Sequence, residues 1–181
     1  MLVSNVKYYE NLDFAKYLTM PGVSYSSLKE GVTYSSGMSL GTKVHNYILE
    51  PHKYEYGEDH KIVAEISQEL LKIIDISLFE KELSVTADFE HEGFALPFKG
   101  RIDLGVRNKI VIDFKILQGS LESSINYFGY DKQLSGYCYA CGADNAVIIS
   151  YNKSKKCTEV KLIKPNPNFW EQEILKRGKV L

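Results

Sequence analysis

Hydrophobic positions recur at helical spacing in two stretches of the first half of the chain. The spacing predicts helices over residues 38–50 and 58–79, and Pro51 ends the first of them. The apolar positions that define the two helices are Leu40, Val44, Tyr47 and Ile48, then Ile62, Ile66, Leu70, Ile73 and Ile74. Residues 1–36 show neither the helical spacing of hydrophobic residues nor the alternation of a strand, and they are expected to form an irregular lead-in. Within them, Tyr25-Ser26-Ser27-Leu28 could begin a short helix with a serine as its N-cap.

After residue 80 the pattern changes to short alternating segments typical of strands. Tight links at residues 91–93 and 106–108 separate three of these segments. The expected strands are 82–89, 94–104, 109–117, 146–151 and 158–163, with further helices over about 121–141 and over 168–176. No linker or change in composition divides the chain. The pattern therefore predicts an α/β (α+β) fold, with a single mixed β-sheet flanked by helices in one domain over residues 1–181.

Composition narrows the class of protein. The chain has 181 residues, of which 44% are hydrophobic, and 22 Lys and Arg nearly balance 23 Asp and Glu. Any contact with nucleic acid must therefore come from a local patch rather than from a global basic field. No apolar run approaches the roughly 20 residues that span a bilayer, so no membrane partner is expected. The first residues do not resemble a signal peptide, and three cysteines fit a reducing cytoplasm.

Two neighbouring strands carry the residues with the most specific chemistry. Asp113 and Lys115 share one face of their strand because they are two residues apart, and a short turn can bring Asp103 beside them. Two carboxylates can hold a hard divalent cation such as Mg²⁺, which activates water and polarises a phosphoryl oxygen. A nearby ammonium can orient or deprotonate the water and offset charge on the phosphorus. The alternative is a half-exposed strand whose outer face alternates charges for cross-strand pairing.

Three further polar residues lie on predicted helices. His45 falls at the edge of the buried face of its helix, where it could be a ligand or an ordinary packed residue. Gln133 and Tyr137 are one helical turn apart on one face. They could hydrogen-bond a phosphate or stack on the lysine, or they could simply cover the sheet.

The order of these motifs resembles that of the RecB-like branch of the PD-(D/E)XK nuclease superfamily. The motifs are His45, Gly100-x-x-Asp103, Asp113-x-Lys115 and Gln133-x-x-x-Tyr137. The segment from Met38 to Pro51 looks like that of RecE-type phage and prophage exonucleases. Lambda exonuclease and the CRISPR-associated adaptation nucleases are more distant relatives. The resemblance covers residues 24–51 and 80–151 and implies a restriction-endonuclease-like αβββαβ core.

The resemblance also implies roles for individual residues. The expected metal ligands are His45, Asp103, Asp113 and the backbone carbonyl of Phe114, and the expected catalytic residues are Asp103, Asp113 and Lys115. Gln133 and Tyr137 would contact DNA or position Lys115. Glu82 and Arg101 match no motif position. Arg101, as a candidate DNA contact, could pair with a phosphate or equally with a carboxylate.

The function implied is that of a Mg²⁺-dependent, or Mn²⁺-dependent, deoxyribonuclease in the cytoplasm of a bacterial host. We expect an exonuclease that digests one strand of linear double-stranded DNA for phage-type recombination, with a single-strand annealing protein as partner. Relatives form rings, so a homo-oligomer is expected as well. Two alternatives remain open: a structure-specific or nonspecific endonuclease, and a non-catalytic DNA-binding module of the same fold.

Overall fold

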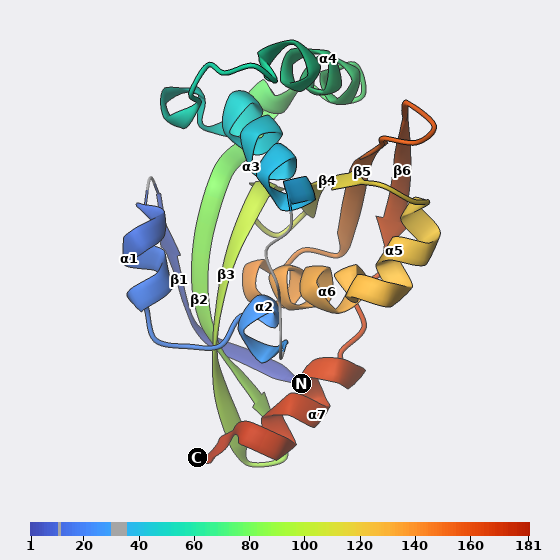
Figure 1. The fold of residues 1–181 in the computed structure, drawn as a ribbon. Coiled ribbons are helices and arrows are strands. Elements are labelled where there is room, and N and C mark those ends of the chain that lie inside the picture. Colours follow the sequence, from blue (N-terminus) through green and yellow to red (C-terminus); the bar gives the residue numbers. More distant parts are fainter. Residues whose placement is uncertain (11, 30–35) are drawn as a thin grey trace.

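The computed structural model describes residues 1–10, 12–29 and 36–181. Within them the chain forms one seven-stranded mixed sheet (Figure 1). Its strands are β1 (Leu2–Tyr9), β2 (Glu80–His91), β3 (Phe94–Val106), β4 (Ile110–Leu117), β5 (Asn145–Asn152), β6 (Cys157–Ile163) and β7 (Lys179–Val180). The first six follow one another across the sheet in this order, and β7 pairs with β3. Only β4 and β5 run parallel; the other pairs are antiparallel. The predicted single mixed sheet is therefore confirmed.

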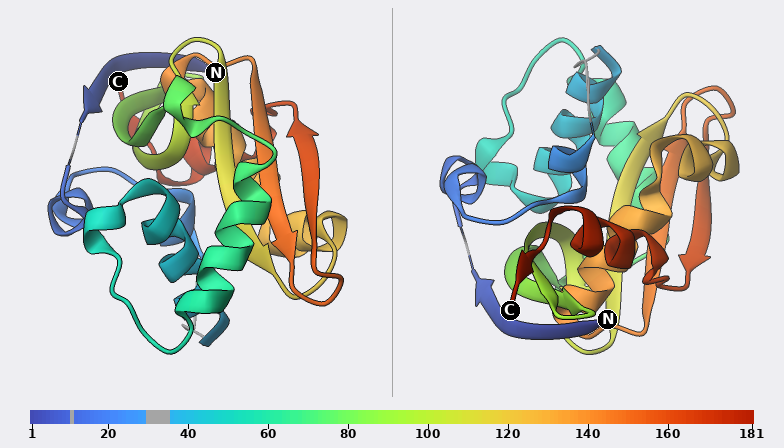
Figure 2. Two further views of the ribbon diagram at one scale, coloured as in Figure 1. Left: turned by 90° about the horizontal axis from the view of Figure 1, so that it is seen from above. Right: turned by 90° about the horizontal axis from the view of Figure 1, so that it is seen from below.

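Helices cover both faces of the sheet, which gives three layers (Figures 1 and 2). On one face, α3 (Ser36–Leu49) and α4 (His60–Leu71) pack on a cluster that includes Ile112, Phe114 and Ile149. On the other face, α5 (Leu121–Phe128), α6 (Tyr130–Cys141) and α7 (Asn168–Arg177) enclose a larger cluster. Because both faces of β4 are buried, its charged residues lie inside the molecule. No described helix is long and apolar enough to cross a membrane.

The lead-in is more regular than the sequence predicts. Its first segment is the edge strand β1, whose pairing with β2 is interrupted between Ser4 and Lys7, where Asn5 has a φ of 52°. This irregularity shifts the register and so breaks the alternation by which a strand is normally recognised. A short helix, α1 (Phe14–Thr19), follows. The predicted helix at Tyr25 is confirmed as α2 (Tyr25–Leu28), with Ser24 as its N-cap.

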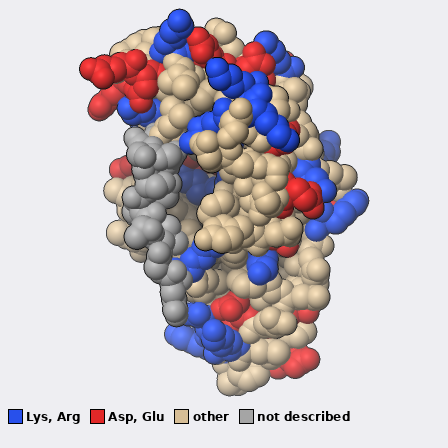
Figure 3. Space-filling model, turned by 45° about the vertical axis from the view of Figure 1, so that its right-hand side comes forward, with Lys and Arg blue, Asp and Glu red and all other residues tan. Residues whose placement is uncertain are grey.

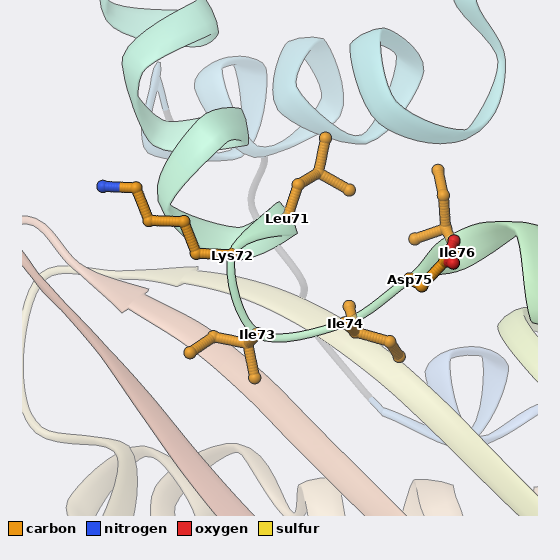
Figure 4. Close-up of a pocket in the computed structure, with 6 residues that line it drawn as sticks. All are labelled: Leu71, Lys72, Ile73, Ile74, Asp75 and Ile76. Atoms are coloured by element: carbon orange, nitrogen blue, oxygen red, sulfur yellow. The ribbon is translucent and has the colours of Figure 1, made fainter.

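The second predicted helix is too long. It ends at Leu71 rather than near residue 79, and a 3₁₀ turn, η2 (Ile76–Leu78), begins where the Asp75 side chain accepts a hydrogen bond from Ser77 N. The intervening turn forms an open pocket of about 470 Å³ (Figure 4). Its lining residues are Leu71, Lys72, Ile73, Ile74, Asp75 and Ile76. None of the predicted site residues lines this pocket.

The predicted helix over 121–141 is two helices. Gly129 separates α5 from α6 with a φ of 65°, a left-handed conformation that glycine adopts without steric cost. A Cβ at this position would lie 1.9 Å from Tyr25 Oη, so the close approach of that phenol also requires glycine. The remaining strands and the last helix lie within two residues of their predicted bounds, apart from β7, which the sequence does not signal.

Candidate active site

The site lies where β3 and β4 move apart. Their antiparallel pairing ends at Leu104 and Ile112, so Asp103 and Asp113 occupy the next opposed positions. Instead of a strand hydrogen bond, the Phe114 backbone N–H donates to Asp103 Oδ2 at 2.8 Å. The Asp103 carboxylate thus fills the gap between the strands. The predicted proximity of Asp103 to the Asp113 strand is confirmed.

His45 approaches Asp103 from the helix layer. Its Nε2 lies 2.8 Å from Asp103 Oδ1, and its Nδ1 lies 3.1 Å from Glu82 Oε1. On α3 the neighbouring Val44 and Ile48 point into the core, which turns His45 toward the end of the β3–β4 gap. The ligand atoms of His45, Glu82 and Asp103 all lie within 4.8 Å of one another. The imidazole therefore contacts two carboxylates at the gap, and its role as a metal ligand stays a prediction.

Glu82 belongs to the site although it matches no motif position. It lies on β2 opposite Asp103, between the pairs Lys81–Leu104 and Leu83–Ile102, and it has a φ of 50°. Such a backbone conformation is costly for a glutamate and is concentrated at functional sites. The hairpin turn that places His91 opposite Phe94 fixes this register. Counting back from that turn therefore places Glu82 opposite Asp103, a signal that the sequence contains.

Asp113 and Lys115 form a buried ion pair on the face of β4 that α6 covers. Lys115 Nζ lies 2.6 Å from Asp113 Oδ2, and Asp113 is only 3% exposed. Lys115 also lies over the ring of Tyr130, 4.9 Å from its centroid. A half-exposed strand with charges alternating for solubility is therefore excluded, since this face is covered by α6.

The charged groups of the site perturb one another strongly. Burial disfavours the charged forms of His45 and Lys115, but the neighbouring carboxylates outweigh it and raise the pKa of His45 to about 9 and that of Lys115 to about 12. Burial and the charge of Asp103 raise the pKa of Asp113 to about 6, although Lys115 opposes the shift. Burial likewise raises the pKa of Glu82, whereas His45 and Lys115 hold the pKa of Asp103 below its usual value against the effect of burial.

Arg101 is bound within the protein. Its guanidinium contacts Glu82 through Nε and Glu50 Oε1 through Nη2, the latter at 3.0 Å, and Nη1 donates to Leu12 O. The side chain is 11% exposed. The sequence leaves open whether Arg101 pairs with a phosphate or with a carboxylate. In the structure it pairs with the carboxylates of Glu50 and Glu82, and a contact with DNA stays a prediction.

Gln133 and Tyr137 lie together on α6 behind the sheet. Gln133 Nε2 donates to Tyr137 Oη at 3.0 Å. Tyr137 is buried against Gly100, where a Cβ would lie 2.8 Å from its ring. The predicted pairing on one helical face is thus present. Whether either residue contacts DNA or acts on Lys115 stays a prediction.

The donor set fits a hard divalent cation. Two carboxylates and one imidazole, from Glu82, Asp103 and His45, lie together at the gap, and the charge of Asp103 acts on a third carboxylate, that of Asp113. Oxygen-rich sets of this kind suit Mg²⁺ or Mn²⁺. Two buried oxygens, Glu82 Oε1 and Asp113 Oδ2, accept no hydrogen bond among the described residues, although each faces a cationic group. Buried acceptors without hydrogen bonds are uncommon and often mark a site for an ion or water.

Comparison of the structure with solved structures identifies the fold. A provisionally named exonuclease from Eubacterium rectale is similar over 88% of this chain and 71% of its own, with a TM-score of 0.53 and 18% identity. The chain therefore shares the α+β fold of this solved structure, with its single mixed sheet. A phage-related exonuclease from Haemophilus somnus is also similar, over 90% of this chain and 86% of its own, at 16% identity and a TM-score of 0.38. An alkaline exonuclease from Laribacter hongkongensis has 13% identity and a TM-score of 0.37, with 80% and 77% of the two chains covered. No family model matches the sequence, and no curated protein is significantly similar to it.

Proposed function

We propose that the chain is a metal-dependent nuclease that hydrolyses phosphodiester bonds in DNA. The observation that carries this proposal is the convergence of Glu82, Asp103 and His45 at the gap beside the Asp113–Lys115 pair. Strand pairing is interrupted here, and a carboxylate takes its place. A DNA-binding module without catalysis has no use for several carboxylates gathered beside a phosphate, since their repulsion costs free energy unless a cation offsets it.

The cation would be held by the carboxylates of Asp103 and Asp113 and by His45, with Glu82 beside them. The carbonyl of Phe114 is a further donor, because the N–H and C=O of one strand residue point to the same neighbouring strand, and its N–H points to Asp103. When bound, Mg²⁺ or Mn²⁺ supplies Lewis acidity for the phosphoryl oxygen and for the attacking water. Lys115 supplies N–H donors beside Asp113 that can orient the water and stabilise charge on the phosphate.

The finer proposal is an exonuclease that digests one strand of linear double-stranded DNA. The shared fold with the Eubacterium rectale protein, which bears the name of an exonuclease, supports this choice. Under this proposal the protein supplies single strands for phage-type recombination in a bacterial cytoplasm, with a single-strand annealing protein as partner, and acts as a homo-oligomer. A nonspecific or structure-specific endonuclease would use the same residues, so the substrate decides between them.

A cleavage assay with Mg²⁺ tests the proposal on linear duplex and closed circular DNA of the same sequence. We expect loss of the linear DNA alone, abolished by Lys115→Ala and by EDTA. Lys109→Ala, on the exposed turn between β3 and β4, is the matched control and should cleave like the wild type. Cutting of the circle would replace the exonuclease with an endonuclease. No metal-dependent cleavage of either substrate would overturn the proposal.

A further inference from the structure

A row of aromatic rings runs from the candidate active site to the surface at the junction of α5 and α6. It begins at Tyr130, which carries Lys115 over its ring at 4.9 Å. Tyr130 stacks on Phe128, with ring centroids 5.5 Å apart and an interplanar angle of 22°. Phe128 meets Tyr127 edge to face at 4.9 Å. Exposure increases along the row, from the half-buried Tyr130 to Phe128 at 41% and Tyr127 at 84%.

The backbone that carries this row is firmly held. Tyr25 Oη donates to the carbonyl of Phe128 at 3.0 Å, directly before the left-handed Gly129. The Gly129 N–H donates to Ile125 O at 2.8 Å and so closes the end of α5. The exposed rings therefore lie on a fixed helix end rather than on a loose loop, which lowers the entropic cost of using them to bind a ligand.

Lys29 lies beside the row itself, and Lys132 lies next to Gly129, which follows Phe128. Lys29 Nζ lies 4.6 Å from the ring centroid of Tyr25 and 5.8 Å from that of Phe128, and Lys132 Nζ lies 5.4 Å from that of Phe169. Lys29 Nζ donates to the Phe128 carbonyl, and among the described residues neither ammonium forms an ion pair with a carboxylate. Burial lowers the pKa of Lys29, and the charges of Lys115 and Lys132 lower it further, so both cations repel the Lys29 ammonium.

The net charge of the chain gives it no general attraction for DNA. Its net charge is −1, and on the face shown in Figure 3 the Lys and Arg residues form separate patches with acidic residues between them. A contact with nucleic acid therefore depends on a local combination of features. At the α5–α6 junction, the exposed ring of Phe128 lies near Lys29 and stacks on Tyr130. Tyr130 in turn contacts Lys115.

We propose that Tyr127 and Phe128, with Lys29 and Lys132, bind an unpaired DNA strand that enters or leaves the active site. This inference rests on the proposed nuclease function. It adds that the DNA is single-stranded next to the bond that is cleaved. Exposed rings stack on unpaired bases of any sequence, and each such contact strengthens binding roughly 5- to 150-fold. In a duplex the base faces are already stacked on one another, so only the lysines can contact it there.

The test measures binding in EDTA, where metal-dependent cleavage does not occur, by fluorescence anisotropy. The probes are a labelled 20-residue oligodeoxythymidine and a blunt duplex of 20 base pairs. Tyr127→Ala should weaken single-strand binding about tenfold and duplex binding by less than threefold. Lys132→Ala should weaken both and reduce the salt dependence of binding. The matched controls are Tyr56→Ala, which removes a 79% exposed ring lying against His60 of α4 on the opposite face of the sheet, and Lys61→Ala on that helix.

The outcomes separate this inference from the proposed function. Three results would overturn the inference even if the protein cleaves DNA. Tyr127→Ala could bind the single strand as tightly as the wild type does, or it could bind both probes more weakly by the same factor. The third such result is a wild type that does not bind the single strand. Conversely, selective loss of single-strand binding in a protein that cleaves no DNA would support the aromatic row and remove the nuclease proposal.

Discussion

Asp103 accepts a hydrogen bond from the Phe114 backbone N–H, and this bond replaces the next rung of the ladder between β3 and β4. One carboxylate oxygen is thereby fixed to the sheet, while the other lies 2.8 Å from His45 Nε2. The backbone thus orients the side chain before any ligand binds. A group held in this way loses little entropy when it takes part in binding or catalysis.

Replacement of Asp103 by asparagine should separate metal binding from folding. An asparagine carbonyl can still accept the hydrogen bond from Phe114, so the variant should fold. Mg²⁺ at about 100 times its dissociation constant should stabilise the wild type by about 2.7 kcal/mol, on the order of 5–10 °C for a chain of this size. Asp103→Asn should lose this shift and at least about 100-fold of its activity. Thermal melts with Mg²⁺ and with EDTA provide the measurement, and an undiminished shift would remove Asp103 from the metal site.

The Asp113–Lys115 pair predicts a strongly non-additive double-mutant cycle. Lys115→Met leaves a buried carboxylate without its cation and should destabilise the metal-free protein by about 3 kcal/mol at pH 7.5. Asp113→Asn in the same chain should restore most of that loss, because it removes the unpaired charge. Because the pKa of Asp113 is raised to about 6, the cost of Lys115→Met should shrink at pH 5. Urea unfolding in EDTA of the wild type, Lys115→Met, Asp113→Asn and the double variant measures the cycle, and an unrestored double variant would contradict the pairing.

Much of this site could be predicted because strand alternation carries local information. The two-residue spacing of Asp113 and Lys115 is sufficient to place them on one face, and a short turn is sufficient to bring Asp103 opposite. The burial of that face was not predictable from β4 itself, because it depends on α6, which covers the strand from a distant part of the sequence. Glu82 depends on distant elements in the same way, because its place beside Asp103 follows only when the register of the β2–β3 hairpin is combined with the position of His45.

The elements that could not be predicted involve a break in a regular pattern. The irregularity at Asn5 hides β1, and the left-handed Gly129 divides an otherwise continuous helical pattern. Gly129 is needed because Tyr25, more than 100 residues earlier, occupies the space where a side chain would lie. A single sequence does not reveal such a distant contact. The last strand, β7, has only two residues, which is too short for an alternating pattern. It pairs with β3 because α7 ends beside that strand.

Arg101 should act on the site through Glu82. Arg101→Ala leaves Glu82 and Glu50 without their shared cation, so the free energy of unfolding should fall by about 3 kcal/mol, and Mg²⁺ affinity should fall roughly 10- to 100-fold. The salt dependence of DNA binding should stay unchanged, because the guanidinium is occupied by carboxylates. A direct phosphate contact would instead lower the salt slope by about 0.7–0.9 per lost contact. Anisotropy titrations at several salt concentrations distinguish the two roles.

His45 should make the metal-free protein less stable at alkaline pH. Its pKa is about 9 in the folded protein, against an ordinary value of 6.5, so the folded state binds the proton more tightly than the unfolded state. The resulting stabilisation is present in full below pH 6.5 and is largely lost as the pH rises to 9, by about 3 kcal/mol. His45→Gln has no proton to lose in this range and should show a flatter profile. Urea unfolding in EDTA between pH 6 and pH 9 provides the comparison, and equal slopes would contradict the shift.

Two helical glycines should respond oppositely to the same substitution. A Cβ at Gly136 would lie 2.6 Å from the buried ring of Trp170. That ring is fixed in place because its Nε1 donates a hydrogen bond to Lys132 O. A Cβ at Gly41, by contrast, would meet nothing within 4 Å. Gly136→Ala should therefore destabilise the protein by about 1–3 kcal/mol through overpacking. Gly41→Ala should stabilise it by roughly 0.5–1 kcal/mol, because alanine favours the helix. Trp170 is the single tryptophan, so its fluorescence follows unfolding and should shift in the native state of Gly136→Ala only. Stabilisation by Gly136→Ala would mean that α6 and α7 can separate at little cost, and the close packing of α7 against α6 would then be wrong.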